Sequence, residues 1–192
     1  MKITTIENER FFIRPAAADD KEAFMHLQQE NSELSGAYDD EAFREHYWKG
    51  VLEGEDDVYM LVFLKEDGRH IGNCSFQNVN SPAIEIGIDI DKRVQNRGFG
   101  TAVLTLLVAF LRANAPEQRC LIRTKSTNAP CRRMIEKAGG VRIGEEATDF
   151  DRIMDEMLPK MEKAGLTQEM GGTGNLLDRS RGVCTYIYEF MK

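Results

Sequence analysis

The hydrophobic and polar positions of this 192-residue chain follow two periods, and their order predicts a mixed architecture. Alternating or short apolar runs bounded by turn residues predict strands, whereas apolar residues three and four positions apart predict helices. The expected strands are 10–15, 58–64, 71–79, 84–90, 120–125, 141–144 and 183–190. Helices are expected after Asp19 or Asp20, after Asp39 or Asp40, at 101–111 and after Pro130. This order predicts an α/β sheet with helices on both faces.

The length of the chain suits one sizeable core, so we expect residues 1–192 to form a single domain. A helical insertion is expected at about 145–182, before the last strand, with methionines on one face and Pro159 within its helix. The glycines at 171–174 predict a flexible loop. The sequence leaves three alternatives open for the methionine-rich face: packing on the core, contact between two copies in a homodimer, or closure as a lid.

Net charge and hydropathy exclude several classes of partner. A net charge of −7 and a pI of about 5.1 argue against binding to nucleic acid and weakly favour cationic or neutral partners. The longest apolar run, 102–111, is too short to span a bilayer, so no membrane partner is expected. The first ten residues lack the apolar stretch of a signal peptide.

The cysteines are far apart in the sequence, and they form no zinc-binding spacing pattern with the three histidines. Cys74, Cys120, Cys131 and Cys184 form no C-x-x-C pair. We therefore expect neither a metal site nor a disulfide framework, and a cytoplasmic location is the natural setting for reduced thiols.

Residues 95–100, Gln-Asn-Arg-Gly-Phe-Gly, join the expected strand 84–90 to the expected helix 101–111. A glycine-bearing turn before a helix leaves backbone N–H groups unpaired, and these groups with the helix dipole favour a phosphate or pyrophosphate. Neither the dinucleotide fingerprint G-x-G-x-x-G nor the P-loop sequence G-K-S/T is present here. The pattern that remains is Q-x-x-G-x-G.

Three motifs in this order resemble the GNAT superfamily of N-acetyltransferases. The segment 95–100 resembles its acetyl-CoA pyrophosphate loop, and Glu85-Ile86-Gly87 begins thirteen residues before Gly98, as in its central strand. Asn128 is followed at the family's spacing by Glu136-Lys137-Ala138-Gly139. The resemblance covers 85–144 closely and 10–77 more loosely, fails at 145–182, and is nearest to the ribosomal-protein N-terminal alanine acetyltransferase branch. It implies the GNAT fold, a mixed, mostly antiparallel twisted sheet of about seven strands with helices on both faces.

The resemblance implies acetyl-CoA as co-substrate, with no metal. The amides of 97–101 would hold the pyrophosphate, and the preceding strand would carry a bulge and splay from its neighbour, so that its free backbone groups pair with pantetheine. The residues implied to bind acetyl-CoA are Ile88, Asp89, Ile90, Gln95, Asn96, Arg97, Gly98, Phe99, Gly100, Thr101 and Asn128. A solvated surface arginine is the alternative for Arg97, and a plain helix cap is the alternative for Asn128.

Glu85 is the main candidate for a general base, because an ammonium group must lose a proton before the amine attacks a thioester. Strand alternation places Glu85 and Asp89 on one face, and a surface or ion-paired role is the alternative for both. Many family members protonate the leaving thiolate with a tyrosine seven residues after the asparagine, but that position is Ile135 here. Cys131 and Tyr186 are the remaining candidate acids, with core packing as the alternative for each.

We therefore expect transfer of an acetyl group from acetyl-CoA to a primary amine, a small molecule or a protein N-terminus, by direct attack in a ternary complex. The alternative is a non-catalytic GNAT-fold module that binds CoA and regulates or scaffolds, which the missing tyrosine at position 135 motivates. Segments 31–38 and 145–182 are expected to shape the acceptor site. The acidic residues expected to attract a cationic amine there are Glu33, Asp39, Glu145 and Glu146.

Overall fold

The computed structural model describes residues 3–32, 35–148 and 183–191. Within these ranges one sheet runs in the order β1-β2-β3-β4-β5-β6-β8-β7, with every neighbouring pair antiparallel except β5 and β6. The strands are β1 (Ile6–Glu7), β2 (Phe11–Pro15), β3 (Val58–Leu64), β4 (His70–Gln77), β5 (Ala83–Ile90), β6 (Arg119–Lys125), β7 (Gly140–Glu146) and β8 (Thr185–Phe190). The α-helices are α1 (Lys21–Asn31), α2 (Glu41–Glu53), α3 (Phe99–Asn114) and α4 (Ala129–Lys137). Short 3-10 helices are η1 (Ala18–Asp20), η2 (Ser35–Asp39) and η3 (Lys92–Val94).

The predicted α/β fold class is confirmed, and each of the seven expected strands is present, with the predicted bounds for Val58–Leu64 and slightly different ends for the others. The additional strand, β1, pairs Ile6 with Ile13 at the edge of the sheet. Two residues are too short to show a two-residue period, so the sequence pattern did not reveal this strand.

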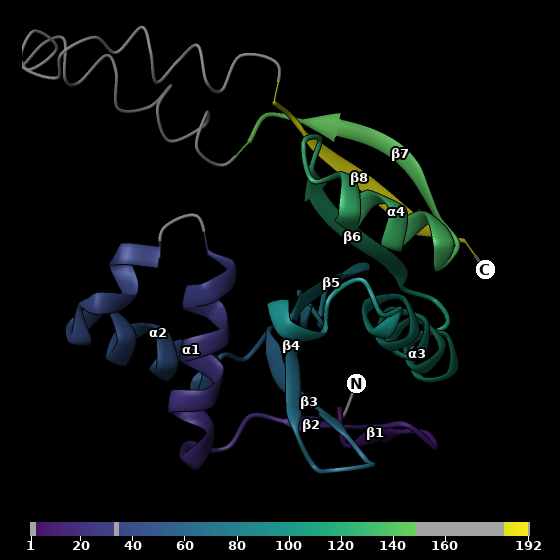
Figure 1. Cartoon of the computed structure of the whole chain (residues 1–192). Helices are drawn as coiled ribbons and strands as arrows, with labels where there is room; N and C mark the ends of the chain where they lie inside the picture. Colours follow the sequence, from purple (N-terminus) through teal and green to yellow (C-terminus); the bar gives the residue numbers. More distant parts are fainter. Residues whose placement is uncertain (1–2, 33–34, 149–182, 192) are drawn as a thin grey trace, which may run out of the picture.

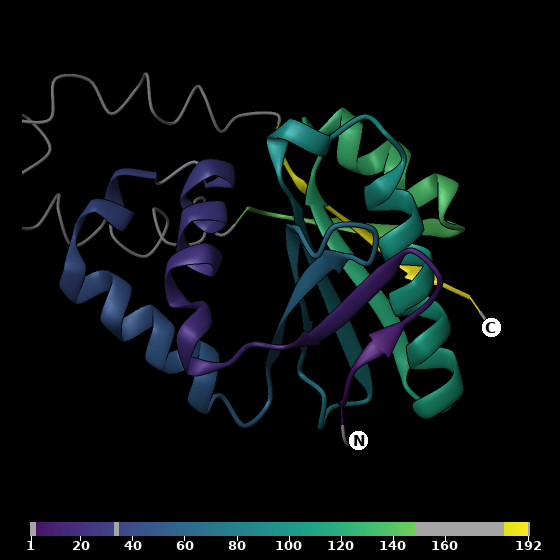
Figure 2. The same cartoon turned by 60° about the horizontal axis from the view of Figure 1, so that its bottom comes forward.

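Helices cover both faces of the sheet (Figure 1). The helices α1 and α2 lie on one face, and α3 and α4 lie on the other, which Figure 2 shows from a second direction. The larger core lies between the sheet and α3 and α4, where Leu104 and Leu107 of α3 are fully buried. A smaller core around Phe24 and Trp48 fills the space between α1, α2 and the sheet.

Of the two predicted aspartate caps, one forms and one does not. Asp40 caps α2, because its carboxylate accepts hydrogen bonds from the amides of Ala42 and Phe43. Asp20 stands at the N-cap position of α1, but its carboxylate instead accepts from Arg14 and from the amide of Ala17. This bidentate pair fastens the start of α1 to β2.

The strands β5 and β6 run side by side for only part of their length. Their pairing covers Ala83 to Glu85 of β5 and ends at Leu121 of β6. The rest of β5 therefore keeps a partner in β4 alone, which matches the splay implied by the resemblance. The implied bulge is absent, since the register between β4 and β5 continues without a shift from Gln77↔Glu85 to Gly72↔Ile90.

The strand that precedes the expected insertion is longer than predicted. Glu145 and Glu146 belong to β7 and pair with Tyr186 and Thr185 of β8, so the strand extends two residues beyond the predicted end at Gly144. The expected methionine-rich helix and the glycine loop at 171–174 lie outside the described residues, as does Glu33. In the part of the chain described, no helix is both long enough and apolar enough to cross a membrane.

Candidate active site

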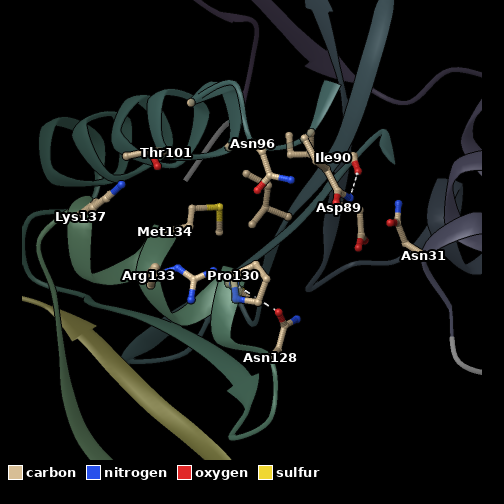
Figure 3. Close-up of a pocket in the computed structure, with 15 residues that line it drawn as sticks. Asn31, Asp89, Ile90, Asn96, Thr101, Asn128, Pro130, Arg133, Met134 and Lys137 are labelled. Atoms are coloured by element: carbon tan, nitrogen blue, oxygen red, sulfur yellow. Dashed lines mark hydrogen bonds between the residues drawn. The ribbon is translucent and has the colours of Figure 1, made fainter. Parts of the chain in front are cut away.

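A cleft of about 420 Å³ lies where β5 ends and α3 and α4 begin (Figure 3). Ten of its lining residues were predicted site residues: Ile88, Asp89, Ile90, Gln95, Asn96, Gly98, Gly100, Thr101, Asn128 and Cys131. Five others complete the lining: Asn31, Pro130, Arg133, Met134 and Lys137. The cleft has two ends, because Thr101 and Lys137 lie at one end and Asp89 and Asn31 lie at the other.

The loop before α3 has the backbone geometry of an anion site. Asn96 and Gly98 adopt left-handed conformations with φ of 61° and 80°, and Gly98 is the N-cap of the 16-residue α3. Left-handed residues in such a turn direct successive amides toward one side, and the dipole of a long helix adds positive potential there. A Cβ atom placed on Gly98 would meet no atom within 4 Å, so this side of the loop is open. These residues fit a pyrophosphate.

Two cations on α4 face this end of the cleft and were missed in the sequence. Arg133 and Lys137 both line it, and both are exposed to solvent. Residues four apart share one face of a helix, so their spacing was the signal that could have revealed them. Arg97, the cation that was predicted, is exposed and is not among the lining residues.

Two predicted amide side chains are engaged in hydrogen bonds that shape the cleft. The Gln95 amide donates to the Ile90 carbonyl at 2.8 Å, which ties the loop to the end of β5. Asn128 accepts from the Cys131 amide at 3.1 Å and caps α4. Because backbone groups alternate in direction along a strand, Ile88 presents its backbone to the same open side as the Ile90 carbonyl. Ile88 is then the position on β5 best placed to pair with an extended ligand.

Asp89 is a partly buried carboxylate at the far end of the cleft. It lies opposite Asn73 of β4 in register, and Gln28 of α1 donates a hydrogen bond to it at 3.2 Å. Burial raises the pKa of Asp89 above its ordinary value, and the hydrogen bond from Gln28 opposes that shift.

Glu85 is held by an ion pair. The Arg123 guanidinium of β6 contacts the Glu85 carboxylate, and its Nε lies 3.0 Å from Oε1 of Glu146. Glu85 is not among the residues that line the cleft. The structure therefore places this predicted base in a charged network across β5, β6 and β7.

The two candidate acids occupy different surroundings. Cys131 lines the cleft, and burial raises the pKa of its thiol, so the thiol keeps its proton at neutral pH. Tyr186 lies on the α4 side of β8, where the guanidinium groups of Arg132 and Arg142 stand 5.6 and 3.6 Å from its ring centroid. Tyr186 does not line the cleft.

The side chain of Phe99, a predicted site residue, packs away from the cleft. The ring packs edge-on against Phe11 with centroids 6.1 Å apart, and it is not part of the cleft wall. Its amide still belongs to the first turn of α3, where N–H groups have no helical partner. Within the described residues no cluster of three or more potential metal ligands occurs.

Comparisons with known proteins identify a family. Residues 10–141 match the family model described as an acetyltransferase (GNAT) domain. The structure resembles the ribosomal-protein-S5-alanine acetyltransferase of Vibrio fischeri, with a TM-score of 0.61 and 16% identity over 77% of this chain and 88% of that one. It also resembles a ribosomal L7/L12 alpha-N-protein acetyltransferase in complex with coenzyme A, with a TM-score of 0.63 and 16% identity over 76% and 88% of the two chains.

A third solved structure has a similar fold. A chimera of the spermidine N-acetyltransferase from Vibrio cholerae is 16% identical over 72% of this chain and 85% of that one, with a TM-score of 0.62. At such identities the solved structures establish the shared fold alone. No curated protein sequence matched the chain.

Proposed function

The chain belongs to the acetyltransferase (GNAT) domain family, and from this premise we propose that it acetylates a primary amine, a small molecule or a protein N-terminus. The observation that carries the proposal is the loop at Asn96 and Gly98, whose geometry suits an anion and which lies beside the end of β5 that has no β6 partner. An acyl-CoA has a pyrophosphate and a chain of amides, and these two features of the cleft are complementary to them.

The proposed binding mode follows the length of the cleft. The pyrophosphate binds the amides at the start of α3, and Arg133 and Lys137 add positive charge beside it. The pantetheine amides pair with the backbone of Ile88, and the acetyl group then points toward the end with Asp89 and Asn31. The amine enters from that end and attacks the thioester carbonyl directly. Proximity supplies much of the rate, because both reactants are held in one site.

The leaving thiolate has a neutral hydrogen-bond donor nearby. The Cys131 thiol lines the cleft in its protonated form and can stabilise the sulfur of CoA by donating a hydrogen bond. The raised pKa of Cys131 makes it a weak acid, so full proton transfer to the thiolate is unfavourable. In this proposal Cys131 assists the departure and water completes the protonation.

The names of three solved structures support a cationic amine as the acceptor. They give an alanine of ribosomal protein S5, the alpha-N position of ribosomal L7/L12 and spermidine, and free amines of these kinds are cationic at neutral pH. One observation favours the second candidate function, a CoA-binding regulatory module. Many family members have a tyrosine as the acid at the position that the buried Ile135 occupies here.

The test is an acetyl-transfer assay with free thiol as the readout. The full chain is incubated with acetyl-CoA and, in turn, an alanine-initiated peptide, spermidine and lysine, and direct binding of acetyl-CoA is measured in parallel. We expect acetyl-CoA to bind and at least one amine to accelerate thiol release. Binding without acceleration by any of the three would favour the regulatory module, and absence of binding would reject both functions.

A further inference from the structure

The cleft contains a carboxylate without an ionic partner. Asp20, Asp91 and Glu189 each form an ion pair with an arginine, and Glu85 pairs with Arg123. No ion pair involving Asp89 occurs within the described residues, although Asp89 is partly buried. A buried carboxylate is costly unless it is paired or strongly hydrogen-bonded. A ligand cation would supply the missing partner.

The direction of the Asp89 side chain separates it from the pyrophosphate end. Asn73, its register partner on β4, donates to the carbonyl of Phe24 in α1 at 3.1 Å, so this face of the sheet looks toward α1. Successive strand residues point to opposite faces, so Ile88 and Ile90 point toward α3 and α4. Asp89 therefore faces the other side of the sheet from the loop that precedes α3.

The groups around Asp89 carry no charge at neutral pH. Gln28 of α1 donates to it, and two tyrosines interact with it electrostatically, Tyr38 of η2 and Tyr47 of α2. The thiols of Cys74 on β4 and Cys131 on α4 also interact electrostatically with Asp89, from the opposite face of the sheet. Burial raises the pKa of both tyrosines and both cysteines, so all four remain protonated. The shell accordingly leaves one negative charge facing the cleft.

We propose that Asp89 binds the ammonium group of the acceptor and receives its proton, which makes Asp89 the catalytic base of this enzyme. The inference rests on the proposed acetyltransferase function and names the acceptor as a cationic amine. Glu85, the base expected from the sequence, is then a positioning residue whose carboxylate is held by Arg123 at the last paired residues of β5 and β6.

The proposed step balances as follows. The ammonium nitrogen releases one proton to a carboxylate oxygen of Asp89, which passes it to water. The neutral amine then forms a C–N bond with the thioester carbonyl carbon, and the C–S bond breaks. The nitrogen loses its second proton to water while the CoA thiolate takes one up, so the products are the amide, free CoA and one proton. The raised pKa of Asp89 narrows the gap to that of the ammonium and eases the first transfer.

The decisive variant is Asp89→Asn, compared with Glu85→Gln and with Glu189→Gln as the control. Glu189 pairs with Arg119 on the surface and is not among the cleft residues. With the fastest amine of the panel, we expect Asp89→Asn to lower kcat/KM about a hundredfold or more, with acetyl-CoA affinity retained. Glu189→Gln should leave both unchanged, and Glu85→Gln should cost less than Asp89→Asn.

The pH profile separates a catalytic role from a structural one. An enzyme that binds ammonium on an ionised Asp89 is active between the raised pKa of Asp89 and the pKa of the amine, so its kcat/KM falls on both sides. Asp89→Asn requires the free amine, so its kcat/KM should instead rise tenfold per pH unit up to the pKa of the amine. Aniline, which is neutral at pH 7, should show little difference between the two proteins.

Three results would overturn the inference while leaving the proposed function intact. The first is that Asp89→Asn turns over the amine as fast as the wild-type protein. The second is that Asp89→Asn has the same pH profile as the wild type. The third is that Asp89→Asn loses as much rate with aniline as with the cationic amine. A misfolded variant is recognised by a lowered Tm. We expect the opposite, since at neutral pH asparagine removes the cost of burying a charge. If the wild-type protein binds acetyl-CoA but no amine accelerates thiol release, the inference falls together with the proposed function.

Discussion

At the residue scale, Gly98 offers the sharpest test of the donor site, because the chain contains a matched control. Gly98 and Gly68 both have positive φ, 80° and 71°, and a Cβ atom on either would meet nothing within 4 Å. Replacement of either by alanine imposes the same backbone strain, roughly 1–2 kcal/mol. We expect both variants to lose similar stability in urea unfolding. Only Gly98→Ala should also lose acetyl-CoA affinity, because its methyl group projects toward the pyrophosphate site.

The comparison removes stability as an explanation. Gly68 lies in the turn between β3 and β4, away from the cleft residues. If calorimetry gave the same acetyl-CoA affinity for both variants, the loop before α3 would not be the pyrophosphate site. A stability loss confined to one variant would show that the two positions are not matched in strain.

The same scale explains why the sequence could not separate Glu85 from Asp89. Alternation along β5 places both on one face, and this prediction agrees with the contacts of each. Their difference arises from a strand that lies far away in the sequence. Pairing with β6 reaches Glu85 and ends before Asp89, so Arg123 reaches only the first carboxylate. Partners of this kind depend on tertiary structure, and a single sequence does not reveal them.

At the scale of elements, a long hydrophobic period predicted α3 well, and Gly98 and Gly100 predicted the turn before it. The position of cationic side chains of α4 in the cleft was not predicted. The sequence predicted this helix after Pro130, with Met134 and Ile135 as apolar positions, but it did not assign a role to Arg133 or Lys137. The first turn of α3 approaches α4 closely at Gly100, where a Cβ atom would stand 2.7 Å from the sulfur of Met134. That contact brings Arg133 and Lys137 to the cleft.

The contribution of α4 can be measured by neutralising its two cleft-facing cations. We expect Arg133→Gln and Lys137→Gln each to weaken acetyl-CoA binding by up to about fivefold, because an exposed ion pair contributes up to about 1 kcal/mol. The losses should shrink as salt is added, since screening already weakens the wild-type attraction. Arg119→Gln, which removes a cation outside the cleft, is the control. Affinities that do not depend on either residue or on salt would contradict this role.

At the scale of the whole molecule, the sheet consists of two parts joined weakly. The strands β1 to β5 form one part and β6, β8 and β7 form the other, and the three pairs from Ala83↔Arg119 to Glu85↔Leu121 connect them. A ligand lying along the open end of β5 replaces the missing strand partner. Binding of the donor should therefore suppress local opening at this junction, where backbone groups lack a neighbour.

Hydrogen exchange with and without acetyl-CoA measures this effect directly. We expect slower exchange for the amides of Ile88 and Ile90 and for the first turn of α3, because these groups contact the ligand. The amides of α2, which packs on β3 away from the cleft, should change little when exchange occurs by local opening. Equal slowing throughout the chain would instead indicate global stabilisation by mass action. Unchanged exchange at Ile88 in a saturated sample would show that acetyl-CoA does not lie along β5. The assignment of Asp89 to the acceptor end would then be unsupported, because it depends on that position of the donor.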